Sequence, residues 1–147
     1  MAGQLPADSE LEFRRWSLWR RWFGQRSEKY AERYLRLAGY RVLARNVADR
    51  RGEIDLLALS PDRQILVVVE VRSITGNDPQ LALNTVTEPK QRKVAGAAHR
   101  FLSRHRLLGI NLRFDVIGLA WPVGMKKPNI LHIPDAFSSP DRFQFFS

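Results

Sequence analysis

The sequence predicts an α/β fold in which helices pack on a mixed β-sheet. Two stretches place an apolar residue at every third or fourth position, as helices do, and five others alternate or run continuously apolar, as strands do. In chain order these stretches read helix, three strands, helix, strand, strand. At 147 residues the chain is long enough to bury one ordinary core and too short for two comfortable domains.

The first helix is expected over residues 27–38, and the first strand follows it at residues 40–47. Ala31 and Leu35 lie on the helical stripe, and Gly39 is the expected left-handed stop. Glu28 falls at the edge of the buried face. A carboxylate in the first turn is also favoured by the helix dipole, so spacing alone does not assign it a function.

Residues 52–72 are expected to form a β-hairpin that carries acids where a fold alone would not put them. Residues 52–59 alternate with a period of two, and residues 64–71 are apolar and β-branched, as in a strand buried on both faces. Residues 60–63 have turn chemistry, because proline presets φ and aspartate can bond its own backbone.

The register of this hairpin decides which acids meet. If the turn is centred between residues 61 and 62, Glu53 lies opposite Glu70 and Asp55 lies opposite Val68. One face of the hairpin then carries Glu53, Asp55, Glu70 and Arg72. Carboxylates on opposed strands repel each other unless a proton or a cation lies between them. A divalent metal ion is the simplest compensating charge.

The second helix begins at Thr87, which is an expected N-cap followed by an acid and an early proline. Its polar face is basic, with Lys90, Arg92, Lys93, Arg100 and Arg104. This excess indicates phosphate contact, although a charged helix face is often only solvated. His99 and His105 have no partner at metal-ligand spacing and are expected at the surface.

The remaining segments are a loop and two strands. Residues 73–84 are expected to be a loop beside the acidic hairpin, residues 111–120 a strand, and residues 130–133 a short partner strand. Asp115 is expected to be a buried acid paired with Arg113 or a backbone donor, rather than a catalytic group.

Residues 1–24 are expected to form a basic extension, and residues 138–147 a tail. Phe13, Trp16 and Trp19 recur at helical spacing among arginines, which predicts an amphipathic helix. Three roles stay open for it: docking on the domain, an arm that stacks on nucleic acid, or adsorption at a membrane surface.

Charge and composition narrow the function classes. Residues 1–51 hold 12 basic and 6 acidic side chains, residues 52–89 hold 2 and 6, and residues 90–147 hold 10 and 3. An acidic hairpin between basic flanks is typical of a metal site within a polyanion-binding surface, although solubility alone also explains a basic protein. The absence of cysteine excludes disulfides and thiolate chemistry, and we expect a cytoplasmic protein with neither a secretion signal nor a membrane span.

The acidic hairpin also matches a family pattern. Gly-Glu-Ile-Asp at residues 52–55, followed by a hydrophobic strand ending Glu70-Val71-Arg72, resembles the YraN-type uncharacterised bacterial family. Its members look like PD-(D/E)XK nucleases, related to restriction endonucleases and archaeal Holliday junction resolvases. The resemblance implies a restriction-endonuclease-like αβββαβ core over residues 25–137.

Two further segments support the resemblance. The family pattern Gly-x-x-Gly-Glu-x-x-Ala-x-x-Tyr-Leu runs over residues 24–35, with Ser27 in place of the second glycine, and Arg-Phe-Asp-Val falls at residues 113–116. In the related resolvases the corresponding helical glutamate, here Glu28, helps to complete the active site.

The resemblance implies a set of site residues. Asp55, Glu70 and the Val71 carbonyl would hold Mg²⁺ or Mn²⁺, and Glu28 would tune a metal-bound water or a second ion. Arg72 stands where the nuclease pattern usually has lysine; it can stabilise an oxyanion but cannot act as a base near pH 7. From the second helix, Lys90 or Lys93 is a candidate substitute, and nucleic-acid contacts are expected from Lys90, Arg92 and Lys93.

Two functions follow as alternatives. One is a metal-dependent endonuclease acting on DNA, branched forms included, and the other is a nuclease-like module that binds DNA without cutting it. A membrane-surface adaptor rests on the N-terminal helix alone. A homodimer stays open as the assembly.

Overall fold

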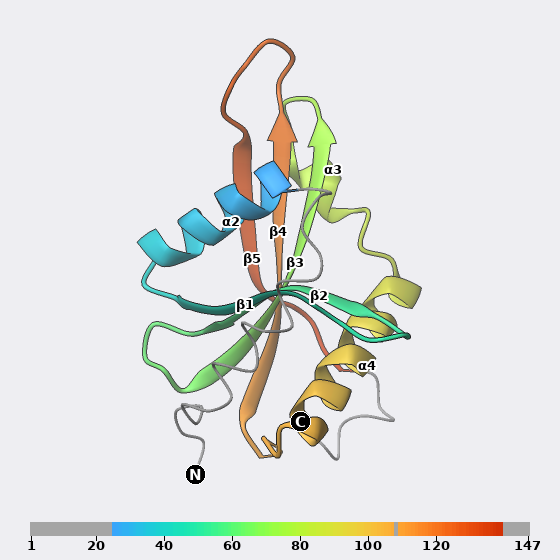
Figure 1. Cartoon of the computed structure of the whole chain (residues 1–147). Helices are drawn as coiled ribbons and strands as arrows, with labels where there is room; N and C mark the ends of the chain where they lie inside the picture. The colour runs from blue at the N-terminus through green and yellow to red at the C-terminus, as the bar shows by residue number, and fades with distance from the viewer. Residues whose placement is uncertain (1–24, 108, 140–147) are drawn as a thin grey trace.

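A computed structural model of the chain describes residues 25–107 and 109–139 and shows one five-stranded sheet with helices on both faces (Figure 1). The elements are α2 (Gln25–Leu37), β1 (Arg41–Ala48), β2 (Glu53–Leu59), β3 (Ile65–Thr75), α3 (Pro79–Leu83), α4 (Glu88–Arg104), β4 (Asn111–Trp121) and β5 (Asn129–Phe137). The predicted α/β class is confirmed, and the element order is confirmed except for α3, which was not predicted. The predicted helix over residues 1–24 and the tail from residue 140 lie outside the described residues.

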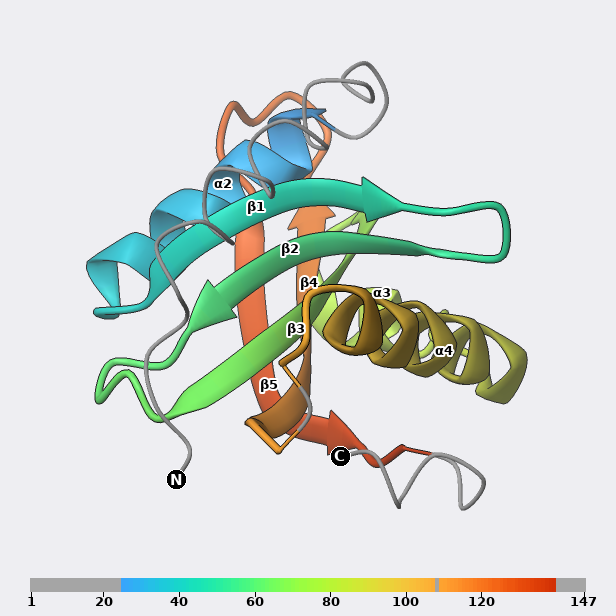
Figure 2. The ribbon, with the colours of Figure 1, turned by 60° about the horizontal axis from the view of Figure 1, so that its bottom comes forward.

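The sheet is mixed, with strand order β1-β2-β3-β4-β5. Neighbours pair antiparallel except β3 and β4, which run parallel. A parallel pair needs a crossover connection, and α3 and α4 supply it. Figure 2 shows α2 and α4 on opposite sides of the sheet, with β1 and β2 swinging away from β3 toward their connecting turn.

Helix α2 covers one face of the sheet. Ala31 and Leu35 are fully buried against Val67, Val69 and neighbouring apolar residues of the central strands. The helix ends as predicted, since Gly39 adopts φ +93° and the Tyr40 N–H returns to the Leu35 carbonyl at 2.9 Å. Apolar spacing therefore located this helix within two residues.

Helix α4 covers the other face. Val94, Ala98 and Leu102 pack against the second core cluster, which includes Val68 and Phe114. Thr87 is the N-cap as predicted, with its side chain accepting from the Lys90 N–H.

The turn between β1 and β2 lies directly on α4. A Cβ on Gly52 would stand 2.8 Å from the Lys93 carbonyl oxygen, so no other residue fits there without moving the helix. Asp49 accepts from the Arg51 and Gly52 N–H groups and pairs with Arg100 of α4. The glycine that begins the acidic hairpin is therefore a packing residue.

The predicted hairpin register is wrong by two residues. Val68 pairs with Leu57, and not with Asp55. The turn is centred between residues 62 and 63, because Arg63 takes a left-handed φ of +64° and the Ser60 N–H closes the loop on the Ile65 carbonyl at 2.9 Å. A shift of two residues preserves the face on which each side chain lies. The convergence of the acids therefore survives the error.

Three other expectations need correction. Residues 73–84 are not a simple loop, because β3 follows β4 in register up to Thr75 and Asp78 then caps α3. The last strand is longer than residues 130–133. His99 is buried at 6% exposure, with Nε2 3.1 Å from Ser139 Oγ, so its predicted surface position is wrong.

No described helix is long and apolar enough to cross a membrane.

Candidate active site

Asp55 lies where β2 and β3 separate. Backbone pairing of the two strands runs from Leu59 and Leu66 to Leu56 and Val69. Beyond that point the Asp55 carboxylate takes the place of a backbone partner, because its Oδ2 accepts from the Val71 N–H at 2.8 Å. The strands are thus held apart by an acid, which leaves a polar site inside the sheet.

Glu70 is the second acid of the site and is almost completely buried, at 1% exposure. Its Oε1 lies 3.5 Å from Lys90 Nζ and 3.7 Å from the Arg72 guanidinium. Among the described residues, no N–H group donates to its Oε2. A buried carboxylate oxygen without a donor is costly, and a cation or a proton shared with Asp55 would satisfy it.

The acids in this site hold protons more tightly than usual. Burial, with the Asp55 charge next, raises the pKa of Glu70 to about 8. Burial, together with the Glu53 charge, also raises the pKa of Asp55. Burial and Asp55 raise the pKa of Glu28 to about 7. These acids resist ionising together, so near neutral pH the site retains protons that a metal ion would displace.

Glu28 comes to the site from the first turn of α2. Its Oε2 accepts from Asn46 Nδ2 at 3.2 Å, and its pKa responds to both Asp55 and Glu53. Asn46 has a left-handed φ of +52°, which asparagine tolerates better than most residues. Sequence reasoning overlooked Asn46, although an asparagine within an apolar strand was a usable signal.

Lys90 and Arg72 approach Glu70 in different ways. Lys90 extends its ammonium group from the first turn of α4. The Arg72 guanidinium makes two hydrogen bonds to Thr85: Nε donates to Oγ1 at 2.8 Å, and Nη2 donates to the backbone carbonyl at 3.1 Å. Arginine therefore secures the segment that leads into α4, a use of the fork that sequence reasoning did not anticipate.

Arg92 and Lys93 lie exposed on the following turn of α4. Within the part of the chain that the structure describes, no ion pair joins either of them to Asp55 or Glu70. Of the two proposed substitutes for the missing lysine, the structure brings Lys90 to the acids and leaves Lys93 outside.

The donors fit a hard cation that keeps part of its own hydration. Within residues 25–107 and 109–139, no three His, Asp or Glu side chains form a ready metal-binding group. Mg²⁺ does not need one, because it is commonly held by one or two carboxylates with water and substrate phosphate completing the shell. Asp55, Glu70 and the Val71 carbonyl are oxygen donors of the required kind, and Glu70 Oε2 has no hydrogen-bond partner among the described residues.

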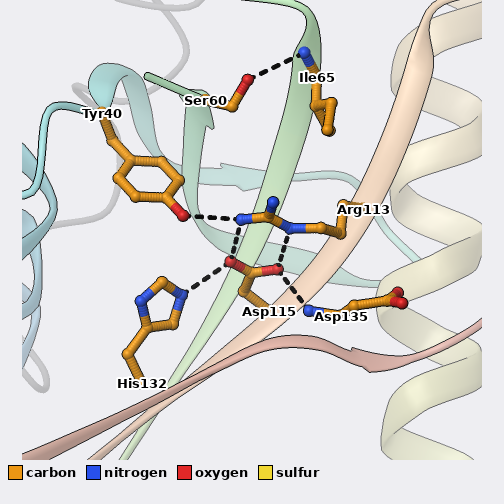
Figure 3. A network of polar contacts seen from close by, with 7 residues as sticks. All are labelled: Tyr40, Ser60, Ile65, Arg113, Asp115, His132 and Asp135. Carbon is orange, nitrogen blue, oxygen red and sulfur yellow. Dashed lines mark hydrogen bonds and ion pairs between the residues drawn. The ribbon is translucent and has the colours of Figure 1, made fainter. Parts of the chain in front are cut away.

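Asp115 is a buried acid of a different kind (Figure 3). Arg113 donates to it twice at 2.8 Å, His132 Nε2 lies 2.8 Å away, and the Asp135 N–H donates at 3.0 Å. Burial works against the charge, yet the bonds from His132 and Arg113 prevail and lower the pKa of Asp115. The predicted burial of Asp115 and its pairing with Arg113 and a backbone donor are confirmed.

Fold and site together define a class. A helix, three antiparallel strands, a crossover helix and a parallel strand form a restriction-endonuclease-like core, with acids placed where its second and third strands part. Comparison with known sequences then gives the family. The family described as Uncharacterised protein family UPF0102 matches residues 27–119, and this chain belongs to it.

Relatives in several bacteria share most of the chain. "UPF0102 protein RB9115" of Rhodopirellula baltica is 39% identical over 117 residues, covering 79% of this chain and 70% of the relative. A "UPF0102 protein" of Geobacter metallireducens is 40% identical over 124 residues, covering 82% and 96%. Another, of Trichlorobacter lovleyi, is 42% identical over 118 residues, covering 78% and 88%. The family match includes Glu28, Asp55 and Glu70.

Proposed function

We propose that this protein is a metal-dependent endonuclease that hydrolyses phosphodiester bonds in DNA, branched forms included. The observation that carries the proposal is the buried Glu70 carboxylate beside Asp55, with one oxygen that no N–H group satisfies. A buried carboxylate oxygen that accepts no hydrogen bond lowers the stability of a fold, and such groups concentrate at sites that bind or react.

Asp55 and Glu70 would hold Mg²⁺ or Mn²⁺ together with the Val71 carbonyl. Such an ion, when bound, neutralises phosphate charge and acidifies a water molecule. The orientation of Asp55 supports this role, because the Val71 N–H donates to Oδ2 and so fixes the direction of the carboxylate.

Glu28 is placed to move a proton. A carboxyl group with a pKa of about 7 changes its protonation readily at neutral pH, which suits a general acid or base. Asn46 holds one of its oxygens, so the side chain keeps a defined direction toward Asp55. Glu28 would accept a proton from the attacking water.

Lys90 would supply the cation that the nuclease pattern usually places at position 72. Its ammonium already contacts Glu70, and a positive charge there can stabilise negative charge developing on phosphate oxygens. Arg72 would position Lys90 and not contact the phosphate, because its hydrogen bonds to Thr85 hold the segment that ends at the N-cap of α4. Arg92 and Lys93, exposed on the same helix, would contact the DNA backbone.

The test is a cleavage assay on labelled duplex, single-stranded and branched DNA with Mg²⁺ or Mn²⁺. We expect Asp55→Asn and Glu70→Gln to lower the cleavage rate at least ~100-fold, since each removes a proposed metal ligand. Glu88→Gln is the matched control, because this acid is exposed in the first turn of α4. If the wild-type protein binds metal and DNA yet cuts none of these substrates, the endonuclease proposal fails.

The second candidate is a DNA-binding module that has lost cleavage. It is favoured by one observation, the commitment of the Arg72 fork to Thr85 instead of the site. On this alternative the wild-type protein is inert, and Arg72→Lys gains metal-dependent cleavage by restoring the usual residue. Inertness of wild type, Arg72→Lys and Lys90→Ala alike on every DNA form would leave only the binding module.

A further inference from the structure

The turn between β4 and β5 projects beyond the end of the sheet (Figure 1). Residues 122–128 carry two strongly exposed apolar side chains, Val123 at 88% and Met125 at 63%. Lys126 and Lys127 follow directly and are also exposed. Single exposed apolar residues are ordinary on protein surfaces, but two at the tip of a projecting turn, next to two cations, offer a partner both apolar and charged contacts.

This turn is firmly anchored on the α2 side. Trp121 Nε1 donates to Ser27 Oγ at 3.0 Å, and the Tyr30 ring meets the Trp121 ring edge-on at 5.3 Å between centroids. Tyr30 Oη also donates to the Lys126 carbonyl at 3.4 Å. Ser27 precedes Glu28 in α2, so the turn is tied to the helical turn that supplies an acid to the site.

A second anchor joins the turn to the end of β3. The Gly76 N–H donates to the Trp121 carbonyl at 2.9 Å, and Asn129 Nδ2 donates to the Asn77 carbonyl at 2.7 Å. Both strands that lead into the turn are therefore held at its base. Because its base is fixed by these hydrogen bonds, the projecting turn can contact a partner without changing its conformation.

The strand register gives the separation between this turn and the acids. Glu70 pairs with Val116 and Thr75 with Trp121, so β4 ends five residues beyond Glu70 and the turn begins directly after it. At about 3.3 Å per residue this is roughly 17 Å. Phosphates along one DNA strand are about 3.4 Å apart along the helix axis, so the distance corresponds to about five nucleotides.

We propose that residues 122–128 form a DNA wedge, which inserts Val123 and Met125 between base steps while Lys126 and Lys127 bind the flanking phosphates. Apolar side chains on minor-groove proteins open base steps in this way. The inference rests on the proposed function for the identity of the partner. The wedge favours branched or kinked DNA, because separating bases costs less where stacking is already weak.

The experiment uses the full chain in EDTA, so that binding is measured without cleavage. A three-way DNA junction carries 2-aminopurine at successive positions along one arm, and the fluorescence rises where a base leaves the stack. We expect a rise at one or two adjacent positions with wild type, and its loss in the Val123→Ser/Met125→Ser double variant. Leu37→Ser is the matched control, because this leucine is 80% exposed near the C-terminal end of α2.

The cations have a separate readout. Lys126→Ala/Lys127→Ala should weaken binding and reduce the slope of log K against log salt by about 2, since two phosphate contacts are lost. Unchanged fluorescence and salt slope in both double variants, with DNA still bound in EDTA and still cut in a separate assay with Mg²⁺, overturn the wedge alone. Loss of binding to anionic vesicles in these variants, with DNA binding intact, also overturns it. Absence of DNA binding in every variant overturns the proposed function and the wedge together.

Discussion

Glu70 and Asp115 are buried acids on neighbouring strands, yet their surroundings are opposite. They lie one residue apart in the register of β3 and β4, and both are nearly inaccessible, at 1% and 0% exposure. Asp115 has partners on both oxygens, whereas Glu70 keeps one oxygen without an N–H donor. Burial alone therefore does not mark a functional acid. What distinguishes the two is whether both carboxylate oxygens accept hydrogen bonds from the fold.

The pKa shifts follow the same division. Bonds from His132 and Arg113 overcome burial and lower the pKa of Asp115, while burial and a neighbouring acid raise the pKa of Glu70 to about 8. The fold stabilises Asp115 as an anion, whereas burial and the Asp55 charge favour the neutral form of Glu70 even with Lys90 at 3.5 Å and Arg72 at 3.7 Å from its Oε1. The first contributes to stability, and the second is maintained at a cost to stability, which is typical of sites that serve a ligand.

The largest expected effect comes from removing each charge with an isosteric amide. Asp115→Asn should lower the free energy of unfolding by about 3 kcal/mol, because Arg113 and His132 lose a buried anion. Glu70→Gln should leave stability unchanged or raise it by on the order of 2 kcal/mol at pH 7. Urea unfolding in EDTA measures both. Destabilisation of similar size in the two variants would contradict the division between these acids.

The next effect is the pH dependence of stability. Folding raises the pKa of Glu28 and Glu70 from 4.5 to about 7 and about 8, so the folded state binds more protons than the unfolded state between those values. Their contribution is complete below about pH 4.5 and is lost as the pH rises toward 8. The opposite holds for Asp115, whose contribution is complete above its ordinary pKa of 3.8 and is lost as the pH falls through its lowered value.

Metal-free protein should therefore become less stable between pH 5 and 8, and Glu70→Gln should flatten this decline. Thermal melting in EDTA across the range tests it. Glu88→Gln, an exposed acid, should keep the wild-type profile. A wild-type profile that is flat or rising over this interval would show that the acids of the site are not held neutral.

The spacing of apolar residues along the chain predicted the features that depend on neighbouring residues, which are the helices, the strands and the face on which each side chain lies. Hydrophobic period located α2, α4 and the strands, and the alternation on β2 placed Asp55 on the same face as Glu70 even though the register was wrong. A two-residue error in register moves side chains along a face but never across it. This is why the acids converge despite a misplaced turn.

Contacts between segments that are distant in the sequence could not be predicted from residue spacing. Thr85 as the partner of Arg72, and Asn46 as the partner of Glu28, depend on how α3 and β1 pack, which has no signature in spacing. His99 was misassigned for the same reason: histidine has an intermediate preference for burial, and only its contact with Ser139 reveals its position.

Metal binding should make Glu70 more like Asp115, because the ion would give the Glu70 carboxylate the partner that Asp115 already has. Mg²⁺ at about 100 times its Kd stabilises a folded protein by at most about 2.7 kcal/mol, and we expect on the order of 1 to 2 kcal/mol here. The shift in Tm should be larger at pH 8 than at pH 6, because protons on Glu70 and Glu28 compete with the ion. Differential scanning fluorimetry measures it. Asp55→Asn should abolish the shift, and an equal shift at both pH values would contradict proton competition.

The smallest effect compares the two arginines that accompany these acids. Arg113 directs its fork at Asp115, whereas Arg72 directs its fork at Thr85 and only approaches Glu70, at 3.7 Å. Lysine cannot reproduce either paired contact. Arg113→Lys should therefore cost about 2 kcal/mol, because it disrupts hydrogen bonds to a buried charge, and Arg72→Lys only about 1 kcal/mol, because Thr85 is neutral and exposed.

The two substitutions should have the opposite order of effect on DNA cleavage, with the larger loss in Arg72→Lys. Arg113 contacts no residue of the proposed site, so Arg113→Lys should cut DNA at the wild-type rate at a temperature where it is fully folded. Arg72→Lys should loosen the segment before α4 and thereby the position of Lys90 over Glu70, which lowers kcat with little change in DNA affinity. Steady-state cleavage and fluorescence anisotropy separate the two quantities. A greater loss of cleavage in Arg113→Lys than in Arg72→Lys would place the working acid at Asp115 and refute the assignment of Glu70.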